Sequence, residues 1–476
     1  MSAIKTRMPC YHPEQPNLSS ILLFVNCLHR TLPLSMTSAA DLEDNSLPVH
    51  ITGSLPKLPP PYSTIATFPP GSFLENLAVR RDGSILVSDM LSGSIWYINP
   101  HAEDGTTQAT LELVHKFAPE DAQVEQSLAV DGPDEQEQGE GEGHGSYAST
   151  PAAEAIVESP ITPDLFYLFS GVHGKKGTWW VYELDMRSFL PYASPAKTSA
   201  TGQVATGVKV KRLAPVPAAT WLNGGTAVPH RSEPLILMAE SYQGRLYSYN
   251  IVRGNVDIWL EHALLGKMTT RPPWPGVNGV KYHHDGRDSW IYFTNSDRAI
   301  LGRIKVENQD VTTVPARNSK EQVDIEILAS GCGGDDLCID GQGNIYVATN
   351  PMNTVLRFSL LAATPRASAG SGGTANAAAE RRVILGLYRP QLSTEEASAS
   401  QPKPGFDSNS DSDREVEVDR DTTGPTAVSF GATASDAKDL YVVTNGGIIN
   451  PVDGVVREAR LLRVHLKLFN VEILDA

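Results

Sequence analysis

Four polar residues hold equivalent positions along the chain, each 10 to 12 residues before an apolar run of β-branched and aromatic residues. Asn223 and Asn278 lie 12 residues ahead of such a run, and Glu75 and Asp335 lie 10 residues ahead. If they converge, two carboxylates and two amide carbonyls would form an all-oxygen cage, which suits a hard divalent cation such as calcium or magnesium. The spacing therefore predicts a metal site, although Asn-Gly and Gly-Asp are also standard turn dipeptides that need no metal.

The apolar runs belong to a phrase that recurs: a Gly/Asp/Asn turn, a short apolar run, a small polar residue, a gap and a second apolar run. The first runs of its six copies begin at Ile85, Leu165, Leu235, Trp290, Ile345 and Leu440. Such self-similarity indicates stacked β units, and six is a usual blade number for a closed propeller. We predict an all-β fold, a six-bladed β-propeller whose first strands present the four polar residues at one mouth of the channel. A sandwich or barrel is the competing architecture.

The spacing of the copies also shows where extra sequence is inserted. First runs end at Glu240, Asn295 and Asn350, a period of 55 residues that suits one four-stranded blade, whereas the next step, to Asn445, is 95 residues long. The compositions of the extra segments are too polar or too poor in large apolar residues to order by themselves. We predict one propeller over residues 51–476, a disordered N-terminal extension at 1–50, an acidic insert at 120–145 and flexible inserts at 362–382 and 392–424.

Charge and composition exclude several classes of partner. The formal net charge is -16, with 55 acidic against 39 Lys and Arg residues, so phosphate backbones and anionic lipids would be repelled. The longest apolar stretch near the start, Ile21–Val25, is too short to span a bilayer. Four cysteines do not make a disulfide framework. We expect a cytoplasmic monomer that acts on a small molecule, without nucleic-acid or membrane partners. Secretion is the alternative, although His29 and Arg30 interrupt the expected signal-peptide order.

Several short motifs resemble those of the regucalcin and gluconolactonase family of six-bladed propellers. They are Glu75 with its Ala-Val strand, the Asn-Gly pair at Asn278, and Asp335 in the stretch Asp335-Asp336-Leu337-Cys338-Ile339-Asp340. The similarity covers roughly Phe68 to Leu466. It implies that Glu75, Asn278 and Asp335 bind a catalytic divalent metal, with calcium expected and magnesium, manganese or zinc as alternatives. It also implies that Asn223 is a fourth ligand or a substrate contact.

The resemblance implies a reaction as well, in which the metal polarises a lactone carbonyl. On physical grounds, a Lewis acid would stabilise the developing oxyanion while Asp335 or Asp336 positions and deprotonates water. The chain departs from the family where Trp221 replaces an arginine two residues before the asparagine, so an apolar wall stands where a charged donor would be. We therefore expect a metal-dependent lactonase or esterase for a small, non-sugar substrate that contacts Trp221, Asn223 and His173.

The competing hypothesis is a non-hydrolytic propeller that binds a small molecule or serves a biosynthetic pathway without a catalytic metal. It predicts no bound metal, and a thermal stability that is indifferent to chelator. The sequence holds no Ser/His/Asp nucleophile context, phosphate-binding glycine loop or nucleotide fingerprint, so covalent catalysis is not predicted.

Overall fold

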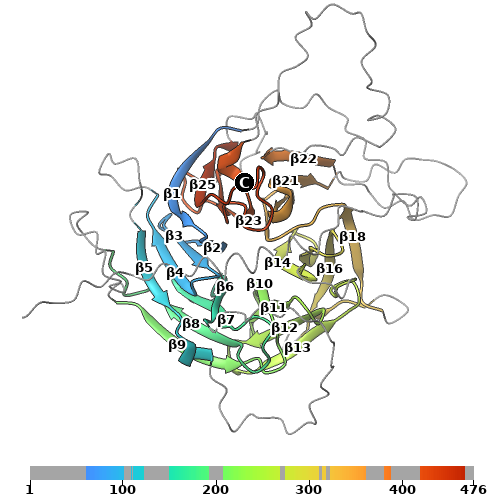
Figure 1. Cartoon of the computed structure of the whole chain (residues 1–476). Helices are drawn as coiled ribbons and strands as arrows, with labels where there is room; N and C mark the ends of the chain where they lie inside the picture. Colours follow the sequence, from blue (N-terminus) through green and yellow to red (C-terminus); the bar gives the residue numbers. More distant parts are fainter. Residues whose placement is uncertain are drawn as a thin grey trace, which may run out of the picture.

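The computed structural model describes residues 60–100, 109, 111–122, 150–191, 207–268, 274–309, 313–317, 322–360, 380–386 and 419–466. These residues form six antiparallel sheets arranged around a central axis, each with its first strand innermost, and the chain passes round the ring in sequence order (Figure 1). The predicted six-bladed β-propeller is confirmed. The predicted extension at 1–50 and most of the three predicted inserts lie outside the described residues.

The strands of the first three blades are given from the channel outward. Blade one contains β2 (Leu74–Val79), β3 (Ile85–Asp89), β4 (Ser94–Ile98) and β5 (Leu111–Lys116). Blade two contains β6 (Ala152–Glu158), β7 (Leu165–Gly171), β8 (Trp180–Asp185) and β9 (Lys209–Pro215). Blade three contains β10 (Leu222–Val228), β11 (Leu235–Glu240), β12 (Arg245–Asn250) and β13 (Val256–Glu261).

The last three blades follow the same order. Blade four contains β14 (Val277–His284), β15 (Ser289–Asn295) and β16 (Ile300–Asn308), and β16 pairs with both β17 (Thr313–Pro315) and β18 (Ile325–Ser330). Blade five contains β19 (Leu337–Ile339), β20 (Ile345–Thr349), β21 (Thr354–Ser359) and β22 (Glu380–Leu385). Blade six contains β23 (Pro425–Phe430), β24 (Leu440–Thr444), β25 (Glu458–Val464) and β1 (Tyr62–Pro70).

The ring is closed by strand β1, which comes first in the described sequence but is the outer strand of the last blade. It pairs antiparallel with β25, from Tyr62 opposite Val464 to Pro70 opposite Glu458. Figure 1 shows the two strands side by side where the two ends of the colour range meet. Backbone hydrogen bonds thus join the two ends of the propeller, so that no blade is left with an open edge at the junction.

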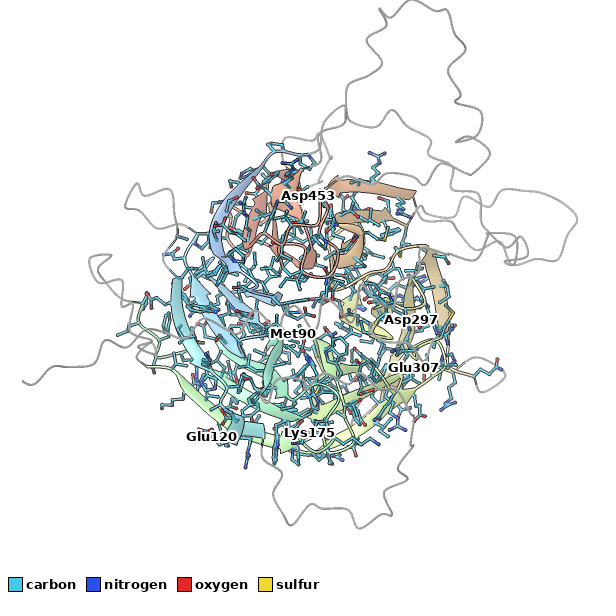
Figure 2. All side chains as sticks on the ribbon, in the orientation of Figure 1. Met90, Glu120, Lys175, Asp297, Glu307 and Asp453 are labelled. Atoms are coloured by element: carbon cyan, nitrogen blue, oxygen red, sulfur yellow. The ribbon has the colours of Figure 1, made fainter. Side chains whose placement is uncertain are left out.

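The blades are held together by apolar side chains that pack between neighbouring sheets. Between blades three and four, Leu237 and Ile291 lie in one buried cluster with Phe293, and all three are 0% exposed. Burying a side chain of this size contributes roughly 1.5 to 3 kcal/mol to folding. Figure 2 shows side chains filling the space between the sheets all round the ring. The middle strands are continuously apolar, and alternate residues of each run serve the two inter-blade contacts, as Ile236 and Leu237 do in β11.

The ends of the predicted inserts are ordered where the structure describes them. Glu380 to Arg382 begin β22 and pair with β21. The insert predicted at 362–382 therefore ends before Glu380. The first acidic residues of the insert at 120–145 belong to a 3-10 turn, η2 (Pro119–Ala122), whose Asp121 carbonyl accepts a hydrogen bond from the Tyr182 hydroxyl at 2.8 Å. Two further 3-10 turns are η4 (Asn350–Met352) and η5 (Arg420–Thr422), the latter at the end of the predicted insert 392–424.

The described residues contain no helix that is long and apolar enough to cross a membrane. Cys332 and Cys338 are buried free thiols.

The inner strands are irregular near the channel axis. The pairing of the first and second strands shifts register between Leu74 and Asn76 in blade one, and between Ala153 and Ile156 in blade two. It shifts again across residues 222–225 in blade three and 277–280 in blade four. A β-bulge bends the strand and re-aims a side chain. Blade six has the same irregularity between Pro425 and Ala427, so five blades use this device near the channel axis.

The two Asn-Gly pairs are strand residues, so their interpretation as turns is wrong. Asn223 and Gly224 lie in β10, and Asn278 and Gly279 lie in β14. A Cβ on Gly224 would lie 2.4 Å from the carbonyl oxygen of Asn278, and one on Gly279 would lie 2.7 Å from that of Asp335. Neighbouring inner strands approach so closely here that no side chain fits between their backbones.

This close approach predicts that Gly279→Ala destabilises the protein by about 2 kcal/mol, since the added methyl group must displace backbone that carries Asp335. The measurement is the free energy of unfolding in urea. Gly341→Ala is the matched control, because a Cβ there meets nothing within 4 Å. Equal unfolding midpoints for the two variants would show that the inner strands can separate without cost.

Candidate functional site

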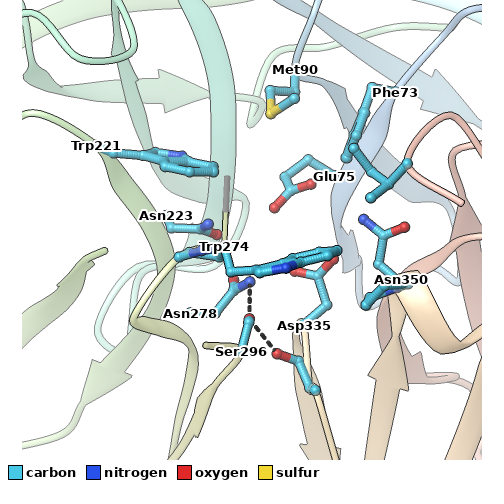
Figure 3. A pocket seen from close by; sticks show the side chains of 15 residues that line it. Phe73, Glu75, Met90, Trp221, Asn223, Trp274, Asn278, Ser296, Asp335 and Asn350 are labelled. Atoms are coloured by element: carbon cyan, nitrogen blue, oxygen red, sulfur yellow. Dashed lines mark hydrogen bonds between the residues drawn. The ribbon is translucent and has the colours of Figure 1, made fainter. Parts of the chain in front are cut away.

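A pocket opens at one mouth of the channel. The four residues predicted from spacing all line it: Glu75, Asn223, Asn278 and Asp335 (Figure 3). Glu75 comes from β2, Asn223 from β10 and Asn278 from β14, while Asp335 precedes β19 by two residues. Each is at most 5% exposed. The structure thus brings together, from four blades, side chains that are up to 260 residues apart in sequence.

The orientation of the Asn278 amide is fixed by a short chain of hydrogen bonds. Its Nδ2 donates to the Ser296 hydroxyl at 3.1 Å, and that hydroxyl donates to the Gly334 carbonyl at 2.7 Å (dashed lines in Figure 3). The amide oxygen, Oδ1, is buried and has no hydrogen-bond partner within the described part of the chain. Leaving a buried acceptor unsatisfied costs about 1 to 3 kcal/mol. An oxygen held in this way is available to a ligand in the pocket.

The two pocket carboxylates are in an unfavourable electrostatic environment. Burial raises the pKa of Glu75 well above its usual value, and repulsion from Asp335 and Glu154 adds to this effect. Burial also raises the pKa of Asp335, as does repulsion from Asp336, although hydrogen bonds from the Asn278 and Asn350 amides offset part of the shift. Neither carboxylate has a salt bridge to any residue that the structure describes. Both can be ionised at low cost only when a positive charge is close to them.

The donor set fits a hard divalent cation. Glu75 and Asp335 provide carboxylate oxygens, and the unpartnered Oδ1 of Asn278 provides a neutral one, which are the ligand types that calcium and magnesium prefer. The described residues contain no group of three or more His, Cys, Asp or Glu side chains arranged to hold a metal. Any cation here would therefore depend on amide oxygens as well as on the two carboxylates.

Asp336, the alternative water-activating residue, is placed differently from Asp335. Its Oδ2 accepts hydrogen bonds from Asn76 Nδ2 at 2.9 Å and from Lys281 Nζ at 2.8 Å. It does not line the pocket. Successive residues of an extended chain point to opposite sides, so when Asp335 faces the pocket Asp336 faces away from it. Of the two carboxylates expected to handle water, only Asp335 lies where a pocket ligand could reach it.

Of the residues predicted to contact the substrate, some line the pocket and one does not. Trp221 lines the pocket, as does Trp274. His173 does not, and lies against the Trp221 ring with 4.8 Å between the ring centroids. Its Nε2 hydrogen-bonds Glu154 Oε1 at 2.5 Å. His173 is thus a neighbour of the pocket wall rather than a part of the lining.

Two residues of the site were missed in the sequence. Glu154 precedes the apolar run at Leu165 by 11 residues, within the 10 to 12 residues that identified the other four, so the same count would have found it. It is 1% exposed and lies in the bulge of β6. Asn350 follows the first apolar run of its blade, where a polar residue recurs for structural reasons. It also lines the pocket and hydrogen-bonds Asp335.

Comparison with known proteins finds similarity in fold. No protein-family model matches the chain, and no curated protein has a significantly similar sequence. Among solved structures, a luciferin-regenerating enzyme has a TM-score of 0.45 and 12% identity, over 85% of this chain and 95% of that chain. The PQQ-bound aldose sugar dehydrogenase of Streptomyces coelicolor has 0.43 and 11%, over 86% and 100%. Regucalcin of Agrobacterium tumefaciens, a calcium-binding protein, has 0.41 and 12%, over 85% and 94%. Regucalcin, whose family the sequence motifs resemble, is thus among the similar structures.

The Asp336 contacts predict that Lys281→Met destabilises the protein by about 2 to 3 kcal/mol, because it leaves a buried carboxylate without its cation. The Lys281 side chain is 26% exposed and that of Asp336 only 5%, so solvent can replace little of the lost interaction. Unfolding in urea measures the change. Lys305→Met is the control, since its pair with Asp288 is about one-third exposed on both sides and should contribute less than about 1 kcal/mol. Similar losses in both variants would contradict the burial argument.

Proposed function

We propose that the protein is a divalent-metal-dependent hydrolase of the lactonase or esterase type. The observation that carries the proposal is the buried, unpartnered Oδ1 of Asn278 beside two carboxylates that repel each other, Glu75 and Asp335. These three residues would hold the metal, with Asn223 as a fourth ligand or a substrate contact. Calcium is expected from the all-oxygen donor set, and magnesium, manganese or zinc are alternatives.

The polar residues Glu75, Asn223, Asn278 and Asp335 form the floor of the pocket. In the proposed reaction they would have different roles. When bound, a divalent cation would supply Lewis-acid polarisation of an ester or lactone carbonyl. Asp335 is the carboxylate able to take a proton from an attacking water, because it lines the pocket and Asp336 does not. The amides of Asn278 and Asn350 hydrogen-bond Asp335 and so hold its carboxylate in place. Asp336 instead stabilises the fold through Lys281.

The rim of the pocket supports a neutral, apolar substrate. Above the polar floor, the lining consists of aromatic, thioether, proline and aliphatic side chains: Phe73, Met90, Trp221, Trp274, Pro275, Pro351 and Ile449. Figure 3 shows the Trp221 and Trp274 rings among the polar residues Glu75, Asn223, Asn278 and Asp335. The described lining includes no Lys or Arg. Such a rim offers little to the hydroxyl groups of a sugar lactone and favours a ring-bearing, non-sugar lactone or ester.

We also propose that the protein acts as a cytoplasmic monomer on this small molecule, without nucleic-acid or membrane partners. The net charge of -16 supports the absence of nucleic-acid and membrane partners, because phosphate-rich surfaces would repel the protein.

Metal binding is tested first by elemental analysis and by thermal unfolding with and without chelator. We expect about one divalent ion per chain, and a loss of about 2 to 3 kcal/mol of stability on chelation, as for a ligand present at 100 times its dissociation constant. Glu75→Gln and Asn278→Leu should each lose the metal. A metal-free protein whose unfolding temperature does not respond to chelator would favour the alternative, a non-hydrolytic small-molecule-binding or biosynthetic propeller.

Turnover is tested with a simple aryl lactone, dihydrocoumarin, and its open-chain ester, phenyl acetate. Asp335→Asn should lower kcat by about 10² to 10⁴-fold, because both the proton acceptor and one metal ligand are weakened. Asp285→Asn, which changes an exposed turn carboxylate, is the control and should leave kcat unchanged. Undiminished hydrolysis by Asp335→Asn would exclude this residue from the reaction.

A further inference from the structure

Glu154 occupies the same kind of position in blade two as the candidate ligands occupy in their blades, but its carboxylate makes different contacts. It lies in the β6 bulge, 1% exposed, and is not part of the pocket lining. Its Oε1 accepts two hydrogen bonds, from His173 Nε2 at 2.5 Å and from Trp221 Nε1 at 3.2 Å. Its Oε2 is buried and has no partner among the described residues. Glu154, at a position where other blades place a pocket residue, thus holds His173 and Trp221 instead.

Trp221, which donates its indole N–H to Glu154, is held by several contacts. Its backbone N–H donates to Glu240 Oε1 at 3.2 Å, and its indole N–H donates to Glu154. The ring packs edge-on against His173 and Tyr242, with centroids 4.8 Å and 5.2 Å away. Since a partly buried indole N–H needs an acceptor, the carboxylate of Glu154 determines which way the indole face is turned.

We propose that Glu154 is a positioning residue that holds Trp221 and His173 as one rigid aromatic wall, and that this wall selects substrates carrying an aromatic ring. The proposal deepens the hydrolase function and rests on it only for the identity of the reaction. Binding of a ring against the wall needs neither metal nor turnover, so the aromatic-wall proposal and the hydrolase proposal can be disproved separately. A fixed aromatic face binds a ring more tightly than a mobile one, because no side-chain ordering is required on binding.

The experiment uses two lactams that cannot be turned over as lactones. Dihydrocarbostyril is the lactam analogue of dihydrocoumarin, and δ-valerolactam is the same lactam ring without the fused arene. Dissociation constants for both are measured by calorimetry on the purified full-length protein. The variants are Glu154→Leu, which removes the acceptor, Glu154→Gln, which keeps an acceptor oxygen, Trp221→Leu, and the double variant Glu154→Leu/Trp221→Leu. Trp259→Leu is the matched control, because that indole donates to the Thr313 carbonyl at 3.0 Å on an outer strand.

We expect the wild type to bind dihydrocarbostyril at least tenfold more tightly than δ-valerolactam. Glu154→Leu should weaken dihydrocarbostyril binding by about tenfold, the upper range for one aromatic contact, and leave δ-valerolactam binding unchanged. Glu154→Gln should stay within about threefold of the wild type. In the double variant the Glu154 change should add nothing to the Trp221 change, because both act through one wall.

Four results would overturn the proposal: no preference of the wild type for the fused arene, a loss in Glu154→Gln as large as that in Glu154→Leu, additive losses in the double variant, or a fall in metal content in Glu154→Leu. The last result would make Glu154 a metal ligand instead. Absence of metal and of lactone hydrolysis in the wild type, together with the expected lactam binding, would reject the hydrolase and keep the aromatic wall.

Discussion

The convergence of six inner strands on one axis is the constraint on which the rest of the structure depends. At the axis the backbones approach so closely that Gly224 and Gly279 have no room for a side chain, and the neighbouring Asn223 and Asn278 are turned toward the channel by bulges in the same strands. The glycine and the asparagine of each pair thus have separate tasks, one permitting the approach and the other using the space that remains. A regular, unbulged strand could not place a polar side chain there without also burying its apolar neighbours in the channel.

The same convergence concentrates negative charge. Glu75, Glu154 and Asp335 are all buried; Asp335 and Glu154 raise the pKa of Glu75, and Glu154 also raises that of Asp335. Asp336 is compensated by the cation of Lys281, whereas Glu75 and Asp335 face the pocket without a counter-charge among the described residues. Folding alone would not favour this arrangement, because a buried carboxylate without a counter-charge is among the most costly groups in a protein. Stored electrostatic cost of this kind is typical of binding and catalytic sites.

Much of this organisation is predictable from sequence, because a repeated unit transfers information from one blade to the next. The six apolar phrases fixed the blade number, and a constant spacing of 10 to 12 residues located Glu75, Asn223, Asn278 and Asp335. Glu154 has the same spacing, 11 residues before Leu165. What the spacing could not give is direction: Asp335 and Asp336 are adjacent in sequence and differ only in the side of the chain to which each points. The role of His173 was equally inaccessible, since it depends on a contact between this residue, in the turn after β7, and a glutamate 19 residues away in β6.

The floor and the rim of the pocket come from different parts of the blades, and in the proposed function this separates chemistry from selectivity. Floor residues are carried by inner strands whose positions are fixed by backbone crowding, so their geometry tolerates little change. The rim residues Trp221 and Trp274 lie just outside β10 and β14, in segments that lead into those strands. Exchange of one rim side chain can therefore alter which molecule enters without moving the floor. Trp221 is nevertheless tied to the channel through Glu154, so a substitution at this rim position changes the contacts of a buried carboxylate as well. That coupling explains why a tryptophan here needs a glutamate in the neighbouring blade: the indole N–H would otherwise be left without its acceptor at the edge of the pocket.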